Sequence, residues 1–256
     1  MNASPESLWP RGEAERSARV DLAACHRLAY RFGLSEGIDN HLTMIVPGRS
    51  DRFYLAPFGL LWAEVRASDL LELDFSGTVV AGQGLVEDTA LYIHLPVHRL
   101  KPDARCVLHT HMPHATALGT LDDPRLPMAV QSALGFFDDI AYADYNGLAL
   151  DYAEGERMAR ALGDRSVLVL RNHGVLVTGR SVAQAFERLY FFERACQVQM
   201  LALSTGRALH LVPDSIVKAT VAQFRDAESV GGQDRAELHF RALKRLLDRD
   251  EADYAT

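Results

Sequence analysis

Imidazole side chains are concentrated in one short part of the chain. Five of the ten histidines lie between residues 94 and 114, and two of them, His109 and His111, are separated by one residue. The surrounding run is typical of a buried strand, in which alternate side chains share a face. His109 and His111 should therefore point the same way, and Pro113 ends the strand where they could converge on one metal ion.

A third imidazole belongs to a turn further along the chain. His173 follows a second buried strand and stands between Asn172 and Gly174, where the glycine lets another backbone segment approach closely. Three histidine ligands with an open fourth position are typical of a catalytic metal site. Each motif alone is compatible with ordinary packing, and zinc, manganese and iron all accept imidazole.

Strand and helix patterns alternate around these motifs. Apolar periodicity and turn residues predict helices over residues 13–32, 88–100, 113–118, 152–162, 182–204, 213–228 and 234–248. Strands are predicted over residues 41–46, 52–56, 70–74, 78–81, 104–110, 140–143, 165–171 and 175–178. This interleaving predicts a layered α/β class. We expect a single domain over residues 13–256, preceded by a flexible N-terminus at residues 1–12.

The composition is that of an ordinary globular chain with an acidic balance. The 256 residues include 34 acidic and 27 basic side chains, a formal net charge of -7. This balance argues against nucleic acid or an anionic membrane as partner, because both attract basic patches. No apolar run reaches the ~18 residues of a membrane span, and the N-terminal residues contain no signal-peptide core. Together with three separated cysteines, these features predict a cytoplasmic protein.

Several short motifs follow one another along the chain. They are GIDNHLT at residues 37–43, YLAPFG at 54–59, KPDA at 101–104, HTH at 109–111 and RNHG at 171–174. Together they resemble the class II aldolase/adducin family, over most of the chain. The resemblance implies a three-layer α/β/α sandwich around a single central sheet, and a homotetramer with active sites between subunits. It also implies one divalent metal per subunit, most often zinc, on His109, His111 and His173.

The resemblance also implies an activity. In such a site the metal chelates a small hydroxy-carbonyl substrate and stabilises the enediolate left when a carbon–carbon bond breaks, so the expected enzyme is an aldolase-type lyase that works by retro-aldol cleavage. A metal-dependent decarboxylase of an aromatic or keto acid is an alternative, because loss of CO₂ leaves a similar electron pair beside an oxygen. A non-catalytic, adducin-like binding or scaffold module is the alternative from another class.

The chain departs from the sugar-phosphate aldolases of the family at the acid/base position. Alignment through His94 and the KPDA motif puts Ala90 where those enzymes carry a glutamate. Glu87, one helical turn earlier, is the expected replacement; the alternative is a solvated acid beside a helix-capping Asp88. Tyr142 fits a family tyrosine that donates a proton across a subunit interface; the alternative is a packed aromatic at a strand end.

The phosphate-binding positions of those aldolases are altered as well. Phe58 stands where a hydroxyl donor is expected, and Asp88 would repel a phosphate. The expected substrate is therefore not a phosphosugar, and the chain resembles the adducin-like branch of the family. We expect substrate contacts from Asn40, His41, Gly59 and Asp88.

Three further histidines lie near the predicted metal ligands in sequence. His94 and His98 are four residues apart on a predicted helix. That spacing could bind a metal, but packing in the core or at an interface is the favoured interpretation. His114 either supports a metal ligand or lies at the surface.

Overall fold

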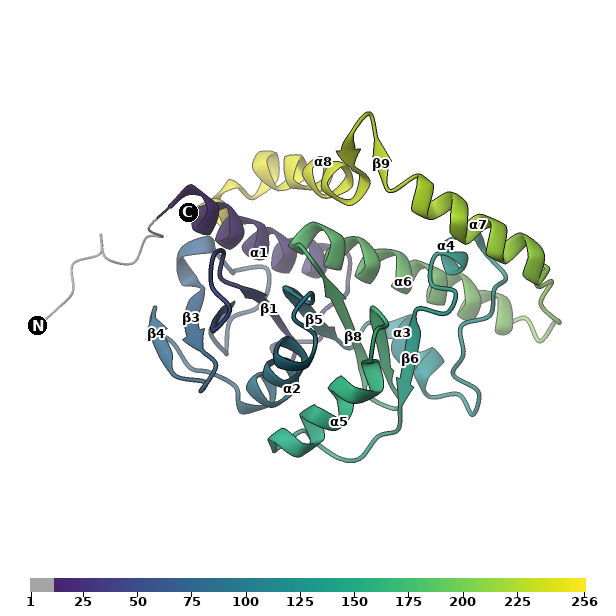
Figure 1. Cartoon of the computed structure of the whole chain (residues 1–256), viewed down its shortest axis with the longest axis horizontal. Coiled ribbons are helices and arrows are strands. Elements are labelled where there is room, and N and C mark those ends of the chain that lie inside the picture. Colours follow the sequence, from purple (N-terminus) through teal and green to yellow (C-terminus); the bar gives the residue numbers. More distant parts are fainter. Residues whose placement is uncertain (1–11) are drawn as a thin grey trace, which may run out of the picture.

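The structure is a computed structural model that describes residues 12–256, so the predicted flexible segment falls outside the described residues except for Gly12. Its centre is an eight-stranded sheet with the order β4-β3-β2-β1-β5-β8-β7-β6 (Figure 1). Neighbouring strands are antiparallel except for β6 and β7, which are parallel. The strands are β1 (His41–Ile45), β2 (Arg52–Leu55), β3 (Leu71–Asp74), β4 (Val79–Ala81), β5 (Cys106–Thr110), β6 (Ile140–Ala143), β7 (Val167–Leu170) and β8 (Gly174–Gly179).

Helices cover both faces of this sheet. The α-helices of the structure are α1 (Glu13–Arg31), α2 (Asp88–Leu100), α3 (Pro113–Gly119), α4 (Gln131–Leu134), α5 (Tyr152–Leu162), α6 (Val182–Leu203), α7 (Asp214–Asp226) and α8 (Arg235–Asp250). In Figure 1, α2 and α5 lie below the sheet, and α1 and α6 lie above it. This is the three-layer α/β/α arrangement that the motifs imply.

The alternation of side chains along β5 explains how both layers are held. Cys106 and Leu108 pack into the core shared with α1 and α6, whereas Val107 packs into the core shared with α2 and α5. All five residues of β5 are buried. Because β5 lies between β1 and β8 at the middle of the sheet, the residues at its carboxyl end are held by three strands and two helical layers.

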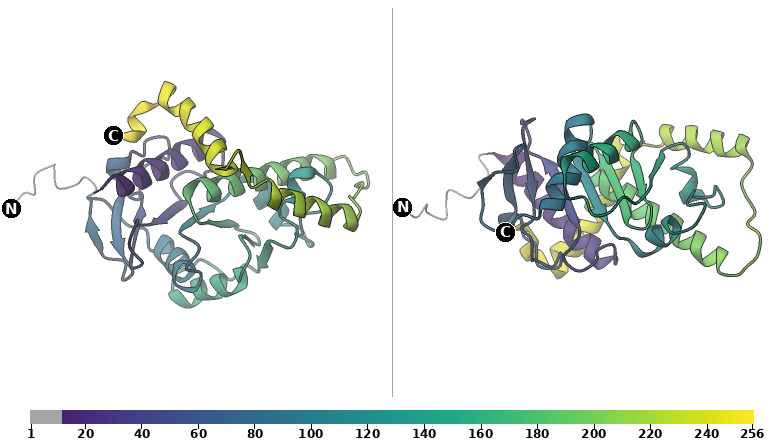
Figure 2. Two further views of the ribbon diagram at one scale, coloured as in Figure 1. Left: turned by 45° about the horizontal axis from the view of Figure 1, so that its top comes forward. Right: turned by 90° about the horizontal axis from the view of Figure 1, so that it is seen from below.

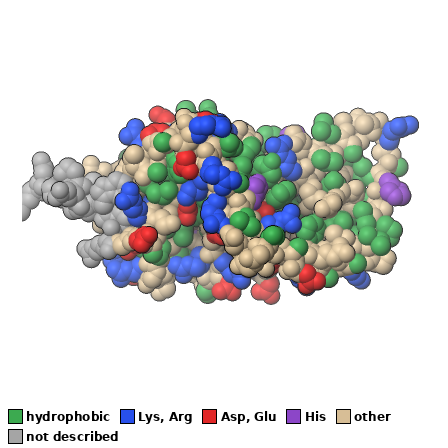
Figure 3. All heavy atoms as spheres, turned by 90° about the horizontal axis from the view of Figure 1, so that it is seen from above, with side chains coloured by type: hydrophobic (Ala, Val, Ile, Leu, Met, Phe, Trp, Pro, Cys, Tyr) green, Lys and Arg blue, Asp and Glu red, His purple; other side chains and the backbone are tan. Residues whose placement is uncertain are grey.

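The C-terminal segment folds back onto the first helix. α8 packs on α1 and α6 through Phe240 and Leu247 (Figure 2). Figure 3 looks onto the face that carries α7 and α8, where basic and acidic side chains both occur. Within residues 12–256, no helix combines the length and the apolar composition needed to cross a bilayer.

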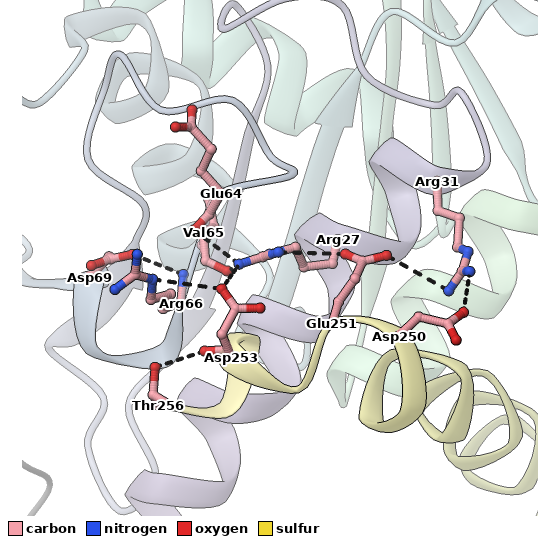
Figure 4. Close-up of polar contacts among 10 residues, drawn as sticks. All are labelled: Arg27, Arg31, Glu64, Val65, Arg66, Asp69, Asp250, Glu251, Asp253 and Thr256. Atoms are coloured by element: carbon pink, nitrogen blue, oxygen red, sulfur yellow. Dashed lines mark hydrogen bonds and ion pairs between the residues drawn. The ribbon is translucent and has the colours of Figure 1, made fainter.

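One arginine of α1 ties this segment to the loop after β2. The Arg27 guanidinium donates to the backbone oxygens of Glu64 and Val65, at 3.1 and 2.9 Å, and to Asp253 at 2.9 Å (Figure 4). Its contact with Glu251 is longer, at 3.5 Å. The Arg27 side chain is only 6% exposed, so its donors are met by protein acceptors rather than by water.

Every predicted strand and helix is present, with ends shifted by no more than two residues. The short helix α4 was not predicted. The region around Gly231 and Gly232 was expected only to interrupt two helices, but it forms a hairpin of β9 (Ser229–Val230) and β10 (Gln233–Asp234). Both glycines have positive φ, +59° and +76°, which suits a tight turn between two short strands.

Candidate metal centre

The three predicted ligands come together at the carboxyl end of β5. The ring centroids of His109, His111 and His173 are 4.8 to 5.1 Å apart. One ligand nitrogen from each ring lies within 4.8 Å of the other two. Three nitrogens bound to one tetrahedral ion lie about 3.4 Å apart, so small side-chain rotations would close the cluster around a metal.

The turn that carries His173 is shaped for this approach. Asn172 has a positive φ of +58°, a conformation that asparagine tolerates better than most residues. A Cβ atom at Gly174 would lie 2.5 Å from the Thr110 carbonyl oxygen and 2.7 Å from Cδ2 of His111. Only glycine therefore lets the start of β8 pass so close to Thr110, at the end of β5, and to His111 just after it.

Hydrogen bonds leave one nitrogen free on two of the rings. Nδ1 of His109 donates to the Val175 carbonyl oxygen at 2.9 Å, so Nε2 carries the lone pair. Nδ1 of His111 lies 2.7 Å from a Glu36 carboxylate oxygen, and its Nε2 is buried with no hydrogen-bond partner. Buried polar atoms are rarely left without a partner. An unpaired Nε2 beside two other imidazoles fits a metal ligand.

Burial keeps the imidazoles of His109 and His173 neutral. It lowers the pKa of His109 well below its usual value, and the neighbouring His41, His173 and His111 lower it further. Burial, assisted by His111, lowers the pKa of His173 to about 4. Neutral imidazole is the form that binds a metal, so both residues are in their ligand form at physiological pH.

Glu36 was not singled out from the sequence, and the structure places it directly behind a ligand. Its carboxylate holds Nδ1 of His111, an arrangement that orients metal-binding histidines in many proteins. Asn40 links the two, because its Oδ1 accepts the backbone N–H groups of Glu36 at 2.8 Å and of His111 at 3.4 Å. The only signal in the sequence was the position of Glu36 directly before the GIDNHLT motif.

A small pocket adjoins the metal centre, and we call it the side pocket. Its walls include Asn40, His41, Phe58, Trp62, Glu87 and His26. His41 joins the two regions, because it stands opposite His109 in the pairing of β1 with β5, with ring centroids 5.0 Å apart. Ala90 also lines the side pocket, whereas the predicted contacts Gly59 and Asp88 do not.

The start of α2 places Glu87 at the side pocket. Glu87 is the residue before the first helical turn, and its carboxylate accepts a hydrogen bond from the Thr89 hydroxyl at 2.5 Å. Asp88 is the first residue of the helix and is exposed, and no side chain caps the helix. The alternative in which Asp88 caps α2 is therefore wrong, because the capping position belongs to Glu87.

The two tyrosines near β6 differ in their surroundings. The hydroxyl of Tyr142 accepts the backbone N–H of Leu126 at 3.1 Å, and burial raises the pKa of Tyr142 above its usual value. Tyr145 lies near the predicted ligands of its own chain, with its ring 6.2 Å from that of His173. The role of Tyr142 in a neighbouring subunit stays a prediction.

The other three histidines between residues 94 and 114 have hydrogen-bond partners outside the predicted metal cluster. Nδ1 of His114 lies 2.7 Å from Glu193, whose other carboxylate oxygen accepts the N–H of Ala115 at the start of α3. His94 and His98 are buried, as the packing interpretation predicts, and both are hydrogen-bonded to Thr43. None of these three belongs to the metal cluster found within the described residues.

Comparison with known proteins identifies the family. The sequence profile described as "Class II Aldolase and Adducin N-terminal domain" matches residues 20–200. A Pseudomonas aeruginosa protein, provisionally named an aldolase class 2 protein, is 37% identical over 94% of this chain and 93% of its own. The crystal structure of an aldolase II superfamily protein from Pseudomonas syringae is 35% identical, with a TM-score of 0.89 over 99% of this chain and 100% of the other.

One further relative is a mouse protein that is much longer than this chain. Mouse alpha-adducin is 33% identical over 92% of this chain, but the match covers only 34% of that longer protein. The shared part is thus most of this chain and about a third of the adducin. From the profile match, the bacterial relatives and the common fold, the chain belongs to the class II aldolase and adducin family.

Proposed function

We propose that this protein is a divalent-metal-dependent carbon–carbon lyase that cleaves a small hydroxy-carbonyl compound without a phosphate group, by a retro-aldol reaction. The observation that carries the proposal is the cluster of three imidazoles with a free, buried nitrogen on His111. Three imidazoles are a poor arrangement for a hydrophobic core, because each buried polar nitrogen without a partner costs about 1–3 kcal/mol. Catalytic zinc sites often combine three protein ligands with one open position.

A divalent ion held by His109, His111 and His173 would polarise the substrate carbonyl and stabilise the negative charge that develops on its oxygen. The three protein ligands are neutral, so they leave the positive charge of the ion uncompensated. We propose zinc, with manganese or iron as other ions that imidazole accepts. A homotetramer, a cytoplasmic location and a small-molecule substrate are part of the same proposal.

The reaction also needs proton transfer, which falls to side chains of the protein. Retro-aldol cleavage removes a proton from a substrate hydroxyl, and a proton must then be returned to carbon. Glu87 is the proposed acid/base because it lines the side pocket beside Ala90, at the start of α2. Tyr142 of a neighbouring subunit is the second candidate donor. Asn40, His41, Gly59 and Asp88 are the proposed substrate contacts.

A decarboxylase of an aromatic or keto acid is the second candidate function. Ala90 favours it, because decarboxylation releases CO₂ without a proton and so demands less of an acid than aldol cleavage does. An adducin-like scaffold is the third candidate, and the similarity to alpha-adducin keeps it in view. A scaffold gives no physical reason for three imidazoles to converge with a free nitrogen.

The test is product analysis on zinc-loaded protein. Panels of unphosphorylated hydroxy-ketones and of aromatic and keto acids are incubated with the wild type and with His173→Ala. The proposal expects an aldehyde product from at least one hydroxy-ketone with the wild type, and none with the variant. Release of CO₂ instead would favour the decarboxylase. Neither product, together with a protein that binds no zinc, would favour the scaffold.

A further inference from the structure

A line of buried polar groups lies behind His41, and we call it the histidine relay. It runs from the Ala104 carbonyl oxygen to Nδ1 of His98 at 2.7 Å, and from Nε2 of His98 to the Thr43 hydroxyl at 2.8 Å. The same hydroxyl is 2.6 Å from Nδ1 of His94, and Nε2 of His94 is 2.8 Å from Nδ1 of His41. Each side chain of the relay is no more than 5% exposed.

The direction of every hydrogen bond in the relay follows from its first member. A carbonyl oxygen only accepts, so Nδ1 of His98 carries the hydrogen and its Nε2 accepts from the hydroxyl of Thr43. That hydroxyl then accepts from Nδ1 of His94, and Nε2 of His94 in turn accepts from Nδ1 of His41. Burial lowers the pKa of His98 to about 4 and that of His94 well below its usual value, so both rings are neutral at physiological pH.

The consequence is an imidazole with a fixed lone pair beside the metal centre. Because Nδ1 of His41 donates to His94, the neutral ring carries its lone pair on Nε2, on the opposite side from the relay. No hydrogen bond to this Nε2 is found among residues 12–256. His41 lines the side pocket, and no donor of the described residues competes with a ligand for its Nε2.

A second imidazole with the same property lines the side pocket. Nδ1 of His26 donates to the Leu22 carbonyl oxygen at 2.8 Å, one turn earlier in α1, which leaves the lone pair on Nε2. His26 is fully buried, and this Nε2 has no hydrogen-bond partner. Burial lowers the pKa of His26 to about 4, so it too is neutral. Trp62 packs edge-on against its ring at 5.2 Å and fixes its orientation.

We propose that the side pocket is a subsite for an uncharged, hydroxyl-bearing part of the substrate, whose hydroxyl groups donate to Nε2 of His26 and Nε2 of His41. This inference rests on the proposed function and narrows its substrate class. Phosphate and carboxylate groups are disfavoured, because a carboxylate or a doubly ionised phosphate offers no hydrogen to the two lone pairs, and either anion would be repelled by Glu87. Among the described residues that line the pocket, none is Lys or Arg.

The remaining walls fit the same class of ligand. Phe58, Trp62, Ile38 and Leu60 contribute apolar surface around a cavity of only about 20 Å³, which has room for one hydroxyl-bearing end of a substrate. Nδ2 of Asn40 is buried without a partner and supplies a donor for a substrate oxygen. A site that hydrogen-bonds a hydroxyl rejects the analogue lacking it, because its own buried polar group is then left unpaired.

The first test is calorimetric binding to the zinc-loaded protein. The probes are erythrulose, a neutral hydroxy-ketone, its 4-deoxy analogue and erythrulose 4-phosphate. We expect the wild type to bind erythrulose about tenfold more tightly than either of the others. His26→Phe keeps the ring shape without the acceptor, and we expect it to lose the preference over the 4-deoxy analogue and to keep its zinc. His239→Phe, in α8, is the matched control and should retain both.

Three outcomes would overturn the proposal. They are equal or tighter binding of the phosphate ester, an unchanged preference in His26→Phe, and the absence of binding by all three probes. The comparison of affinities among the three probes is a separate readout from the formation of an aldehyde product. Erythrulose that binds as expected, while no hydroxy-ketone of the panel is cleaved, would contradict the lyase and leave the subsite standing.

The second test reads the tautomers directly. Nitrogen-15 NMR of histidine-labelled, zinc-loaded protein should show His26, His41, His94 and His98 with the hydrogen on Nδ1. Thr43→Val removes the central hydroxyl of the relay, so we expect His41 to become a mixture of tautomers and erythrulose to bind more weakly at unchanged zinc content. Thr43→Ser should restore the wild-type signals. A hydrogen on Nε2 of His26 or His41 in the wild type would contradict the proposal.

Discussion

Two adjacent residues of α1 belong to buried polar networks of opposite character. Arg27 is charged and has an acceptor for each of its nitrogen groups, from two backbone carbonyls and two acidic side chains. His26 is neutral, and its Nε2 is buried with no partner. Buried polar groups in native proteins are almost always hydrogen-bonded. The network of Arg27, in which every donor has an acceptor, holds the C-terminal segment in place. The unpaired nitrogen of His26 is the one that we assign to a ligand.

The same contrast separates the Arg27 network from the metal centre. Opposite charges balance around Arg27. In contrast, the imidazoles of the site lie beside Glu36, which is hydrogen-bonded to His111, and Glu87, which lines the side pocket, and no Lys or Arg is among the described residues that line that pocket. Buried polar groups that lack a hydrogen-bond partner are expected at functional sites. The predictions that follow test whether the two networks separate structure from function in this way.

The largest expected effect concerns the acid. General acid–base catalysis is typically worth 10²–10⁴-fold, so Glu87→Gln should lower kcat by about that range and leave the zinc content intact. If Tyr142 is the acid, Tyr142→Phe should do so instead. Mixing inactive Tyr142→Phe and His109→Ala subunits should then restore part of the activity, because a shared site draws one intact residue from each chain. Near-normal rates in both variants would point to a decarboxylase.

The next effect is a loss of stability in acid. His26 and His98 each have a folded-state pKa of about 4, below the ~6.5 of an unfolded chain. The unfolded state therefore binds more protons between these values, so stability is complete above pH 6.5 and falls as the pH drops toward 4. Each residue accounts for about 3 kcal/mol of this loss.

Urea unfolding at pH 7.5, 6 and 5 measures that loss. His26→Phe cannot take up the proton, so its stability should fall less steeply with pH than that of the wild type. His210→Gln changes an exposed histidine and should follow the wild-type curve. Parallel curves for the wild type and His26→Phe would show that His26 is not the buried neutral group described above.

Changes in the Arg27 network should affect stability alone. Arg27→Leu leaves the Glu64 and Val65 carbonyls and Asp253 without their donor, and we expect it to lower the free energy of unfolding by about 2–3 kcal/mol. Arg31→Leu removes a more exposed pair with Asp250 and should cost less than about 1 kcal/mol. Neither variant should change the activity per bound zinc ion, and a fall in that activity would erase the distinction between the networks.

A smaller effect is expected from the carboxylate behind His111. Glu36→Gln removes the charge that orients Nδ1 of His111, and such changes typically weaken metal binding by 10- to 100-fold. A zinc competition titration with a chromogenic chelator measures this shift. Glu64→Gln, outside the metal centre, is the control. Unaltered affinity in Glu36→Gln would mean that its hydrogen bond does not support the ligand.

Local patterns in the sequence were enough to predict the cluster of three histidines and nearly all elements. His109, His111 and His173 lie at strand ends that turn residues mark, and β5 and β8 are continuous apolar runs. The histidine relay could not be predicted in this way. It depends on the register that puts His41 opposite His109, and on the packing of α2 that brings His94 to Thr43.

His26 was hidden for a different reason. It lies on the apolar face of a regular helix, where the sequence pattern predicts an ordinary core residue. Its hydrogen bond is to a backbone oxygen within that helix. Only the folded structure shows that Nε2 has no hydrogen-bond partner, that Trp62 packs against the ring, and that His26 lines the side pocket. Glu36 was missed similarly, because its contact with His111 joins a loop to a strand end 75 residues later.

Zinc content is the measurement that tests the central claim most directly. Wild-type protein, loaded with zinc and dialysed, should retain one ion per chain by elemental analysis. His109→Ala, His111→Ala and His173→Ala should each retain none and still unfold cooperatively, because both cores are built from other residues. His210→Ala should retain the ion. A folded wild type without zinc, or full occupancy in any of the three variants, would contradict the three-histidine metal centre.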